Sequence, residues 1–269
     1  MRFDATLIPA TLLKRYKRFL ADVRCEGGSV ITVHCPNSGS MLGLNMPGSP
    51  VLLSRSPNPK RKYPHTLEMV HADGVWVGVN TARANDLVYE GLEQGIINNF
   101  GLVKTRFSGF SRHHLKELPG TVRPHRGCCD ADNNFGTLRK IRREVRVSEK
   151  SRLDFALELE GGNCFLEVKN CTLAQDGVAM FPDAITSRGT KHLEELLLLK
   201  QAGHGAAVLF CVQREDTRLF RPAAHIDPQY ADTLARVSRQ GVMVCAYQAR
   251  VTPDAVTISA QLPVAIPPA

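Results

Sequence analysis

Short apolar or β-branched runs, separated by turn-prone groups rich in Gly, Pro, Asn and Ser, dominate the first 80 residues. Such punctuation predicts short strands and suits a small β-barrel or sandwich, the oligonucleotide-binding barrel among them. The runs lie at residues 19–23, 30–34, 51–54, 66–70 and 75–79.

The pattern changes after residue 80. Residues 80–99 have helical spacing, and the stretch near 106–136 has little periodicity and reads as a long loop or insertion. A hairpin-like stretch follows, then a helix at 189–201, a continuous apolar strand at 206–212, a helix that begins at Asp227-Pro228 and ends at Gly241, and a strand at 242–247. The alternation predicts an α+β protein of two domains: an oligonucleotide-binding-like β-barrel over 1–80 and an α/β mixed-sheet domain over 81–269 with a basic insertion near 106–136.

The hairpin-like stretch, residues 154–169, carries the candidate chemistry. Alternating apolar residues flank Gly161-Gly162-Asn163. A two-residue turn at the glycines would pair Glu160 with Asn163 and Asp154 with Lys169. Because side chains alternate along a strand, Asp154, Glu167 and Lys169 would share one face. A one-residue slip would move Asp154 to the other face.

Two carboxylates beside a lysine are the elements of a divalent-metal site. The alternative is an exposed hairpin face whose charges are solvated. Glu167 and Lys169 end an otherwise apolar strand, where a charged pair costs desolvation free energy unless it is compensated or used. That position favours the metal site.

The basic surplus is local. The chain holds 34 Lys and Arg against 26 Asp and Glu, and residues 104–152 hold 13 basic and 5 acidic residues, which is the whole excess of eight. A basic patch beside a carboxylate cluster attracts a polyanion, although a solvated insertion would have the same composition. Two further basic clusters with an adjacent tyrosine, at 14–18 and 60–63, can track a phosphate backbone or simply protect sheet edges. The candidate nucleic-acid contacts in these regions are Arg15, Lys17, Arg18, Lys60, Arg61, Lys62 and Arg152.

The cysteines and the hydropathy pattern narrow the class. The eight cysteines include no C-x-x-C pair, which disfavours a zinc ribbon, and the adjacent Cys128 and Cys129 would chelate one tetrahedral ion poorly. No apolar stretch is long enough to span a membrane. These features predict a reduced, cytoplasmic, soluble protein with no membrane partner.

Several sequence blocks resemble one known family. They are SRLDF (151–155), EVKNCTL (167–173) and FPDAITSRGTKHL (181–193), with RYKRFLADV (15–23), HCPNSG (34–39) and KRKYPHT (60–66) in the N-terminal half. Together they look like the bacterial and archaeal sugar fermentation stimulation protein A family, and the likeness spans nearly the whole chain. The insertion near 106–136 has no counterpart in the compact members.

The resemblance implies an oligonucleotide-binding-like barrel followed by a domain similar to the PD-(D/E)xK nucleases, and non-specific DNA binding. Leu153 stands where that nuclease pattern often has proline. Carried onto this chain, the pattern makes Asp154 and Glu167 ligands of Mg²⁺ or Mn²⁺ and Lys169 the catalytic lysine. Glu90 is the first candidate for a further upstream metal-binding acid, and Glu144 is the second.

The start of the helix near 189 adds a candidate phosphate site. Cations are disfavoured at a helix N-terminus, so Arg188 and Lys191, with His192, indicate an anionic ligand there; the alternative is a solvated first turn and a locally hydrogen-bonded histidine. The leading hypothesis is a metal-dependent nuclease acting on DNA or RNA without sequence preference.

Two other functions remain as alternatives. One is a DNA-binding regulator of sugar (maltose) metabolism genes that keeps the nuclease fold without turnover. The other, a sugar-metabolism enzyme, is disfavoured because neither paired glycosidase acids nor a nucleotide-sugar fingerprint is present. The oligomeric state is left open, with a homodimer as one alternative.

Overall fold

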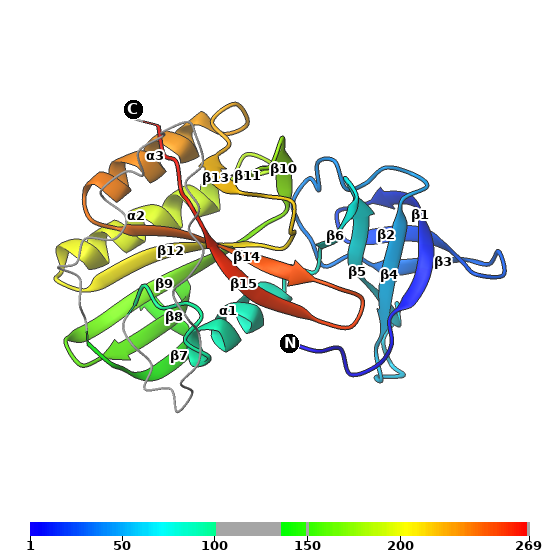
Figure 1. Cartoon of the computed structure of the whole chain (residues 1–269), viewed down its shortest axis with the longest axis horizontal. Coiled ribbons are helices and arrows are strands. Elements are labelled where there is room, and N and C mark those ends of the chain that lie inside the picture. The colour runs from blue at the N-terminus through cyan, green and yellow to red at the C-terminus, as the bar shows by residue number, and fades with distance from the viewer. Residues whose placement is uncertain (101–135, 149–150, 268–269) are drawn as a thin grey trace, which may run out of the picture.

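The computed structural model describes residues 1–100, 136–148 and 151–267. The chain forms an N-terminal β-barrel and a C-terminal domain built on a mixed sheet (Figure 1). This architecture confirms the predicted fold class.

The barrel is formed by five strands, and a sixth strand extends its sheet. The strand order is β3-β2-β1-β4-β5-β6, and a pairing of His34 with Thr66 joins β3 to β5 and closes the barrel. Its interior is apolar, with Leu12, Val23 and Leu53 fully buried. The strands are β1 (Ile8–Tyr16), β2 (Leu20–Cys25), β3 (Val30–His34), β4 (Pro50–Arg55), β5 (His65–Ala72) and β6 (Val75–Gly78).

The C-terminal domain is a six-stranded sheet in the order β15-β14-β12-β9-β8-β7. The three central strands, β14, β12 and β9, run parallel, and the outer pairings are antiparallel. These strands are β7 (Leu138–Ser148), β8 (Ser151–Leu159), β9 (Gly162–Cys171), β12 (Gly205–Val212), β14 (Met243–Val251) and β15 (Val256–Leu262).

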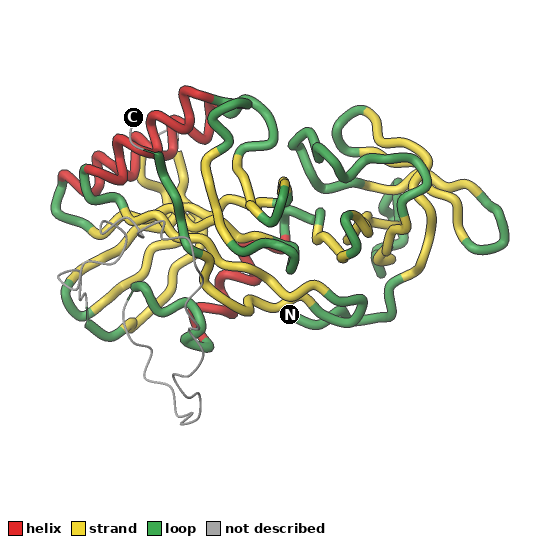
Figure 2. The backbone as a smooth tube through the Cα atoms, turned by 45° about the horizontal axis from the view of Figure 1, so that its top comes forward, coloured by secondary structure: helices red, strands yellow, loops and turns green. Residues whose placement is uncertain are grey.

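Helices cover both faces of this sheet. Helix α1 (Arg83–Glu93) packs on the face that holds Leu157 and Leu166. Helices α2 (Ser187–Gln201) and α3 (Pro228–Arg239) pack together on the opposite face (Figure 2). A small sheet of β10 (Leu173–Gln175), β11 (Val178–Phe181) and β13 (Leu219–Pro222) lies beside them.

The predicted hairpin forms with a different register. Glu158 pairs with Asn163 and Leu159 with Gly162, so Glu160 and Gly161 make the turn. The predicted pairings of Glu160 with Asn163 and of Asp154 with Lys169 are therefore wrong by two residues. The difference is even, so it exchanges no side chain between the two faces of the hairpin.

Other predicted elements match or fall outside the described chain. Asp227 caps α3 as predicted, with its side chain accepting the Tyr230 N–H. The predicted insertion near 106–136, with Cys128 and Cys129, lies outside the described residues except for Gly136. Among the helices of the described segments, none has both the length and the hydropathy that a membrane crossing requires.

Candidate metal and nucleic-acid site

The strand ladder between β8 and β9 ends where the candidate site begins. Its last pair, counted from the hairpin turn, is Phe155 with Leu166, and Asp154 is the next residue of β8 beyond that pair. Beyond that pair, the backbone N–H of Val168 donates to Asp154 Oδ2 at 2.8 Å. A carboxylate thus takes the place of a backbone acceptor, and it lies at the point where the two strands separate.

The neighbouring strand β7 is irregular at the same level. Arg143 pairs with Phe155 and Val145 with Leu153, and between them Glu144 adopts φ of 53°. A left-handed backbone is uncommon for a non-glycine residue and often marks a constrained site. The register sets Glu144 at the level of Asp154.

Glu167 lies at the centre of a polar cluster on β9. Its carboxylate Oε1 accepts from Lys169 Nζ at 2.6 Å and also contacts His192 Nδ1, which projects from α2. Arg188 Nε lies 3.5 Å from the other ring nitrogen, Nε2. This arrangement assigns the proton of a neutral His192 to Nδ1, since Nε2 faces a donor. Glu167 and His192 are both buried.

The two carboxylates differ in how their charge is compensated. Burial raises the pKa of Asp154 to about 6, and the nearby negative charge of Glu167 acts in the same direction. Burial also opposes the ionisation of Glu167, but the hydrogen bond from His192 and the charge of Lys169 outweigh it and lower the pKa of Glu167. The charge of Lys169 therefore favours the ionised form of both carboxylates, but it outweighs burial, together with His192, only at Glu167.

A cavity of about 530 Å³ opens over this cluster. Both acidic and basic side chains line it, so the cavity can attract a cation and an anionic group together. Its lining consists of Glu144, Arg146, Ser151, Arg152, Asp154, Glu167, Arg188 and His192.

The predicted site residues divide into two groups. Asp154, Glu167, Arg152, Arg188 and His192 all line the cavity, and Lys169 contacts the cluster through Glu167. The second-choice acid, Glu144, also lines it. His192 was predicted as a phosphate ligand, and the structure places it against Glu167 instead.

Glu90 and Lys191 lie away from the cavity lining. Glu90 forms an ion pair with the amino terminus of Met1, and Lys191 forms one with Glu195. The prediction that Glu90 belongs to the carboxylate cluster is wrong, because its side chain is used to fix the chain start against α1. Within the described ranges, no three His, Cys, Asp or Glu side chains are grouped closely enough to hold a metal ion by themselves.

Asn85 of α1 is a site residue that sequence reasoning missed. Its Nδ2 donates to Asp154 Oδ1 at 2.8 Å, so Asp154 is held from β9 on one side and from α1 on the other. A lone asparagine in a first helical turn gives no signal in the sequence that could have identified this contact.

The basic residues of the barrel have different roles. Arg15 is partly buried, and its guanidinium donates to the carbonyls of Arg18, Asn37, Gly39 and Ser40. Arg15 is thus committed to holding the loop 37–40, contrary to its predicted phosphate contact. The other predicted basic contacts are exposed, namely Lys17 and Arg18 in the β1–β2 turn and Lys60, Arg61 and Lys62 between β4 and β5.

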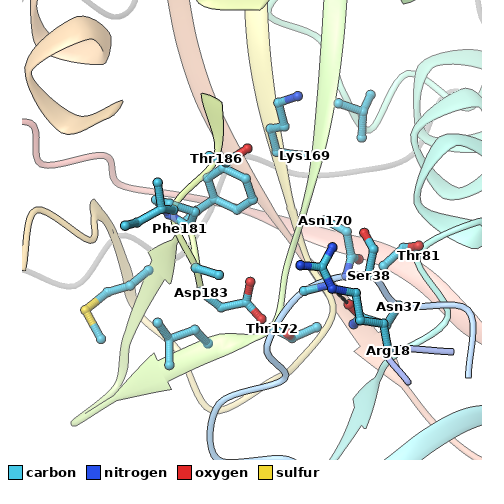
Figure 3. Close-up of a pocket in the computed structure, with 17 residues that line it drawn as sticks. Arg18, Asn37, Ser38, Thr81, Lys169, Asn170, Thr172, Phe181, Asp183 and Thr186 are labelled. Atoms are coloured by element: carbon cyan, nitrogen blue, oxygen red, sulfur yellow. Dashed lines mark hydrogen bonds between the residues drawn. The ribbon is translucent and has the colours of Figure 1, made fainter. Parts of the chain in front are cut away.

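A second cavity, of about 380 Å³, lies between the barrel and the C-terminal domain (Figure 3). The barrel side contributes Arg18, Asn37, Ser38 and Gly39. The opposite wall includes Lys169 and Asn170 of β9 and the segment 180–186. Lys169 thus borders this cavity while its amino group contacts the carboxylate cluster.

Asp183 joins the two domains at this cavity. Its Oδ2 accepts from the Met41 N–H at 2.8 Å, and its carbonyl accepts from Ser40 Oγ. Gly39 makes this approach feasible, because a Cβ there would lie 2.6 Å from Asp183 Oδ1.

The protein therefore belongs to a class with two domains: a closed five-stranded barrel, and a mixed-sheet domain that carries carboxylates where β8 and β9 separate. The family model described as "SfsA N-terminal OB domain" matches residues 13–79, and the one described as "Sugar fermentation stimulation protein RE domain" matches residues 127–255. The chain belongs to the SfsA (sugar fermentation stimulation protein) family.

Curated relatives support this membership over nearly the full length. A sugar fermentation stimulation protein homolog of Desulfotalea psychrophila is 45% identical over 251 residues, covering 93% of this chain and 92% of the relative. A homolog of Thioalkalivibrio sulfidiphilus is 45% identical over 266 residues, covering 98% of both chains.

A solved structure supports the fold. The structure of Pyrococcus furiosus SfsA in complex with Ca²⁺ is similar with a TM-score of 0.78 and 22% sequence identity, covering 99% of this chain and 98% of that one.

Proposed function

We propose that the chain is a divalent-metal-dependent nuclease that binds nucleic acid without sequence specificity and hydrolyses its phosphodiester bonds. The observation that carries the proposal is the convergence of Asp154 and Glu167 on one cavity, with Lys169 Nζ 2.6 Å from Glu167. An ordinary solvated hairpin face would leave these side chains exposed, whereas Glu167 is 4% exposed.

The donor set fits Mg²⁺ or Mn²⁺. Mg²⁺ binds proteins through one or two carboxylates and keeps several waters, so a cage of protein ligands is not required. Asp154 and Glu167 would hold the ion, and Glu144 lies on the same cavity as a further oxygen donor. Burial and, secondly, the negative charge of Glu167 raise the pKa of Asp154, and a bound cation would favour its ionised form against both. The Ca²⁺ complex of the related Pyrococcus furiosus protein supports an oxygen-ligated cation.

A bound divalent ion supplies charge neutralisation at the phosphate and lowers the pKa of a water. The protein side chains would do the rest. The exposed guanidinium groups of Arg152 and Arg188 would bind phosphate oxygens in bidentate fashion, for which their planar shape suits them. The ammonium group of Lys169 would orient the attacking water and stabilise developing negative charge. His192 would keep Glu167 in place.

The barrel would extend the contact with the polymer. Lys17, Arg18 and the group 60–62 are exposed, and Lys62 lies over the ring of Tyr63. Cations beside an aromatic ring suit a nucleic-acid backbone whose bases are recognised by stacking, without hydrogen-bonded readout. This supports binding of DNA or RNA without sequence preference.

Cleavage by an Asp154→Asn variant tests the proposal. We expect nicking of supercoiled plasmid in Mg²⁺ or Mn²⁺ to fall at least about 100-fold, the typical cost of removing one key electrostatic group. Glu158→Gln is the matched control, because Glu158 lies on the same strand but pairs with Arg142 outside the cavity.

Equal cleavage by the wild type and Asp154→Asn would overturn the catalytic role. Two results together would instead favour a DNA-binding regulator without turnover. The affinity for DNA would be the same in EDTA as in the divalent cation, and it would be unchanged in a triple variant of Asp154, Glu167 and Lys169.

A further inference from the structure

We propose that the cavity between the two domains receives one unpaired nucleotide of the bound strand, next to the phosphodiester held at Asp154 and Glu167. The inference rests on the proposed function and specifies its substrate: a strand with an unstacked, unpaired base. The cavity, referred to below as the interdomain pocket, is the one bordered by Arg18, Ser38, Lys169, Phe181 and Ile185.

The size of the interdomain pocket selects a single nucleotide. Its volume of about 380 Å³ is at the lower end of the range for small-ligand sites. Both walls are fixed, since Asp183 joins them through Met41 and Ser40. A base pair with its two sugar-phosphate backbones exceeds a volume of about 380 Å³, so a duplex must present an unpaired or extruded base.

The wall on the barrel side is built with unusual rigidity. Asn37 is 4% exposed, and its side chain accepts from the Gly39 N–H and donates to the Val79 carbonyl. Arg15 donates to the carbonyls of the same loop. The buried Asn37 and the partly buried Arg15 therefore both hold one short loop, which is expected where a surface must keep its shape for a ligand.

Arg18 enters the pocket from a strained turn. Lys17 and Arg18 have φ values of 50° and 62°, a left-handed conformation that L-residues adopt only at an energetic cost. The carbonyl of Arg18 is held by Arg15 Nη2 at 2.8 Å. Glycine or asparagine would adopt this backbone conformation with less strain than arginine. The local conformation therefore gives no reason for an arginine at position 18, and its cationic side chain needs another explanation. A phosphate of the bound strand supplies that reason.

The pocket also offers apolar contacts for a base. Ile185 borders it and is 82% exposed, which makes it the most exposed of the large hydrophobic residues in the described segments. The half-buried Phe181 lies on the same wall (Figure 3). Isoleucine side chains wedge against unstacked bases in several classes of DNA-binding protein.

The pocket adjoins the carboxylate site through Lys169 of β9, which borders the pocket while its amino group contacts Glu167. Glu167 belongs to the first cavity, and Asn170 belongs to the interdomain pocket. Three residues of a strand span about 10 Å. A single strand that places a phosphate at Glu167 therefore reaches the pocket within a short extended segment, and Lys169 lies between the two.

Fluorescence of 2-aminopurine in short oligonucleotides tests the inference. The full-length protein is titrated, in Ca²⁺ and in EDTA, into single strands and into blunt duplexes that carry the probe. We expect the probe to brighten on binding of single strands, because it leaves the stack. Ser38→Phe, which fills the pocket from its exposed rim, is expected to abolish the brightening and weaken single-strand binding about tenfold. Ser38→Ala should behave as the wild type.

A second pair of variants keeps the result interpretable if Ser38→Phe fails to fold. Ile185→Ala should reduce the brightening, whereas Leu198→Ala should not, because Leu198 is a similarly exposed aliphatic residue on α2 away from the pocket. Thermal unfolding and circular dichroism check the fold of all four variants.

Three results would overturn the proposal: no brightening with the wild type, equal single-strand affinity of the folded Ser38 variants, or equal effects of Ile185→Ala and Leu198→Ala. Competition by free nucleoside monophosphate as effective as by an oligonucleotide would also overturn it, since the pocket would then be a site for free nucleotides. The readout is binding, so an enzyme that cleaves nothing still tests the pocket.

Discussion

A buried carboxylate in the barrel and a partly buried one in the C-terminal sheet differ in how their charge is compensated. Glu68 of β5 receives hydrogen bonds from Ser54, Asn80 and both Nε and Nη2 of Arg83. Burial opposes its ionisation, but the bonds and charge of Arg83 prevail and lower its pKa. Among the described residues, Asp154 receives an amide hydrogen bond from Asn85 and one from the Val168 N–H, and burial raises its pKa.

This difference in charge compensation distinguishes a structural carboxylate, Glu68, from a candidate functional one, Asp154. Glu68 has its charge matched within the fold, so it stabilises the junction between β5 and α1 without need of a ligand. Asp154 has the carboxylate of Glu167 nearby, and no cation of the described residues forms an ion pair with it. A carboxylate with so little charge compensation in a cavity is characteristic of a functional site. The predictions below test whether the two carboxylates differ as this comparison requires.

Removing the matched carboxylate should have the largest effect on stability. Glu68→Ala leaves Arg83 partly buried without its partner, and we expect a loss of about 3 kcal/mol in the free energy of unfolding, the lower end for a broken buried pair because Arg83 is a quarter exposed. Urea unfolding followed by circular dichroism measures it. Asp154→Asn should change stability by less than about 1 kcal/mol, and a similar loss in both variants would contradict the comparison.

A divalent cation should stabilise only the protein with the unmatched carboxylate. At a Ca²⁺ concentration 100 times its dissociation constant, the expected gain is about 2.7 kcal/mol, seen as a rise of several degrees in the unfolding temperature. Asp154→Asn should lose most of this rise, and Glu68→Gln should keep it in full. An equal rise in the wild type and Asp154→Asn would show that Ca²⁺ binds elsewhere.

Loosening Glu167 should have a smaller effect. His192→Ala removes one of the two contacts on Glu167 Oε1, and we expect metal affinity to fall about 10- to 100-fold, as for other residues that orient a metal ligand. Cleavage measured against Mn²⁺ concentration should show a shifted midpoint. Lys191→Ala, next in sequence but paired with Glu195, should leave the midpoint in place. A lower unfolding temperature with an unshifted midpoint would reduce His192 to a purely structural role.

The smallest expected effect is the pH dependence that Glu68, the matched carboxylate, gives to the free energy of unfolding. The pKa of Glu68 in the folded state lies below its ordinary value of 4.5, so its contribution is present above pH 4.5 and is lost as the pH falls through the folded value. The gap in unfolding free energy between the wild type and Glu68→Gln should therefore close below pH 4.5. A gap that does not narrow as the pH falls below 4.5 would show that charge does not supply the stabilisation.

Much of the fold follows from apolar periodicity. Strand β12 and helix α3 form close to where the sequence predicts, because a continuous apolar run and an Asp-Pro helix start are strong local signals. Strand β7 was missed because seven of its eleven residues are exposed, five of them basic, so no alternation was visible. Strand β1 was missed for a related reason, since only Leu12 is fully buried in it.

The site was only partly predictable. Asp154, Glu167 and Lys169 stand in one short stretch whose turn limits the possible registers, so sequence could bring them together. The choice between Gly161-Gly162 and Glu160-Gly161 as the turn has no local signal that decides it. The contact of Asn85 with Asp154, and the position of Glu90 outside the cavity, follow from the way α1 packs against β9. The interdomain pocket depends on contacts between residues far apart in the chain.

The close approach of Gly39 and Asp183 has an evolutionary consequence. A side chain at position 39 would collide with the carboxylate at position 183. A variant chain that replaces Gly39 is therefore expected to survive only with a smaller residue at 183, so the two positions should change together across descendants of this sequence. The barrel and the sheet domain are then inherited as a matched pair, and exchanging either one with a distant homolog should yield a chimera whose halves no longer fit.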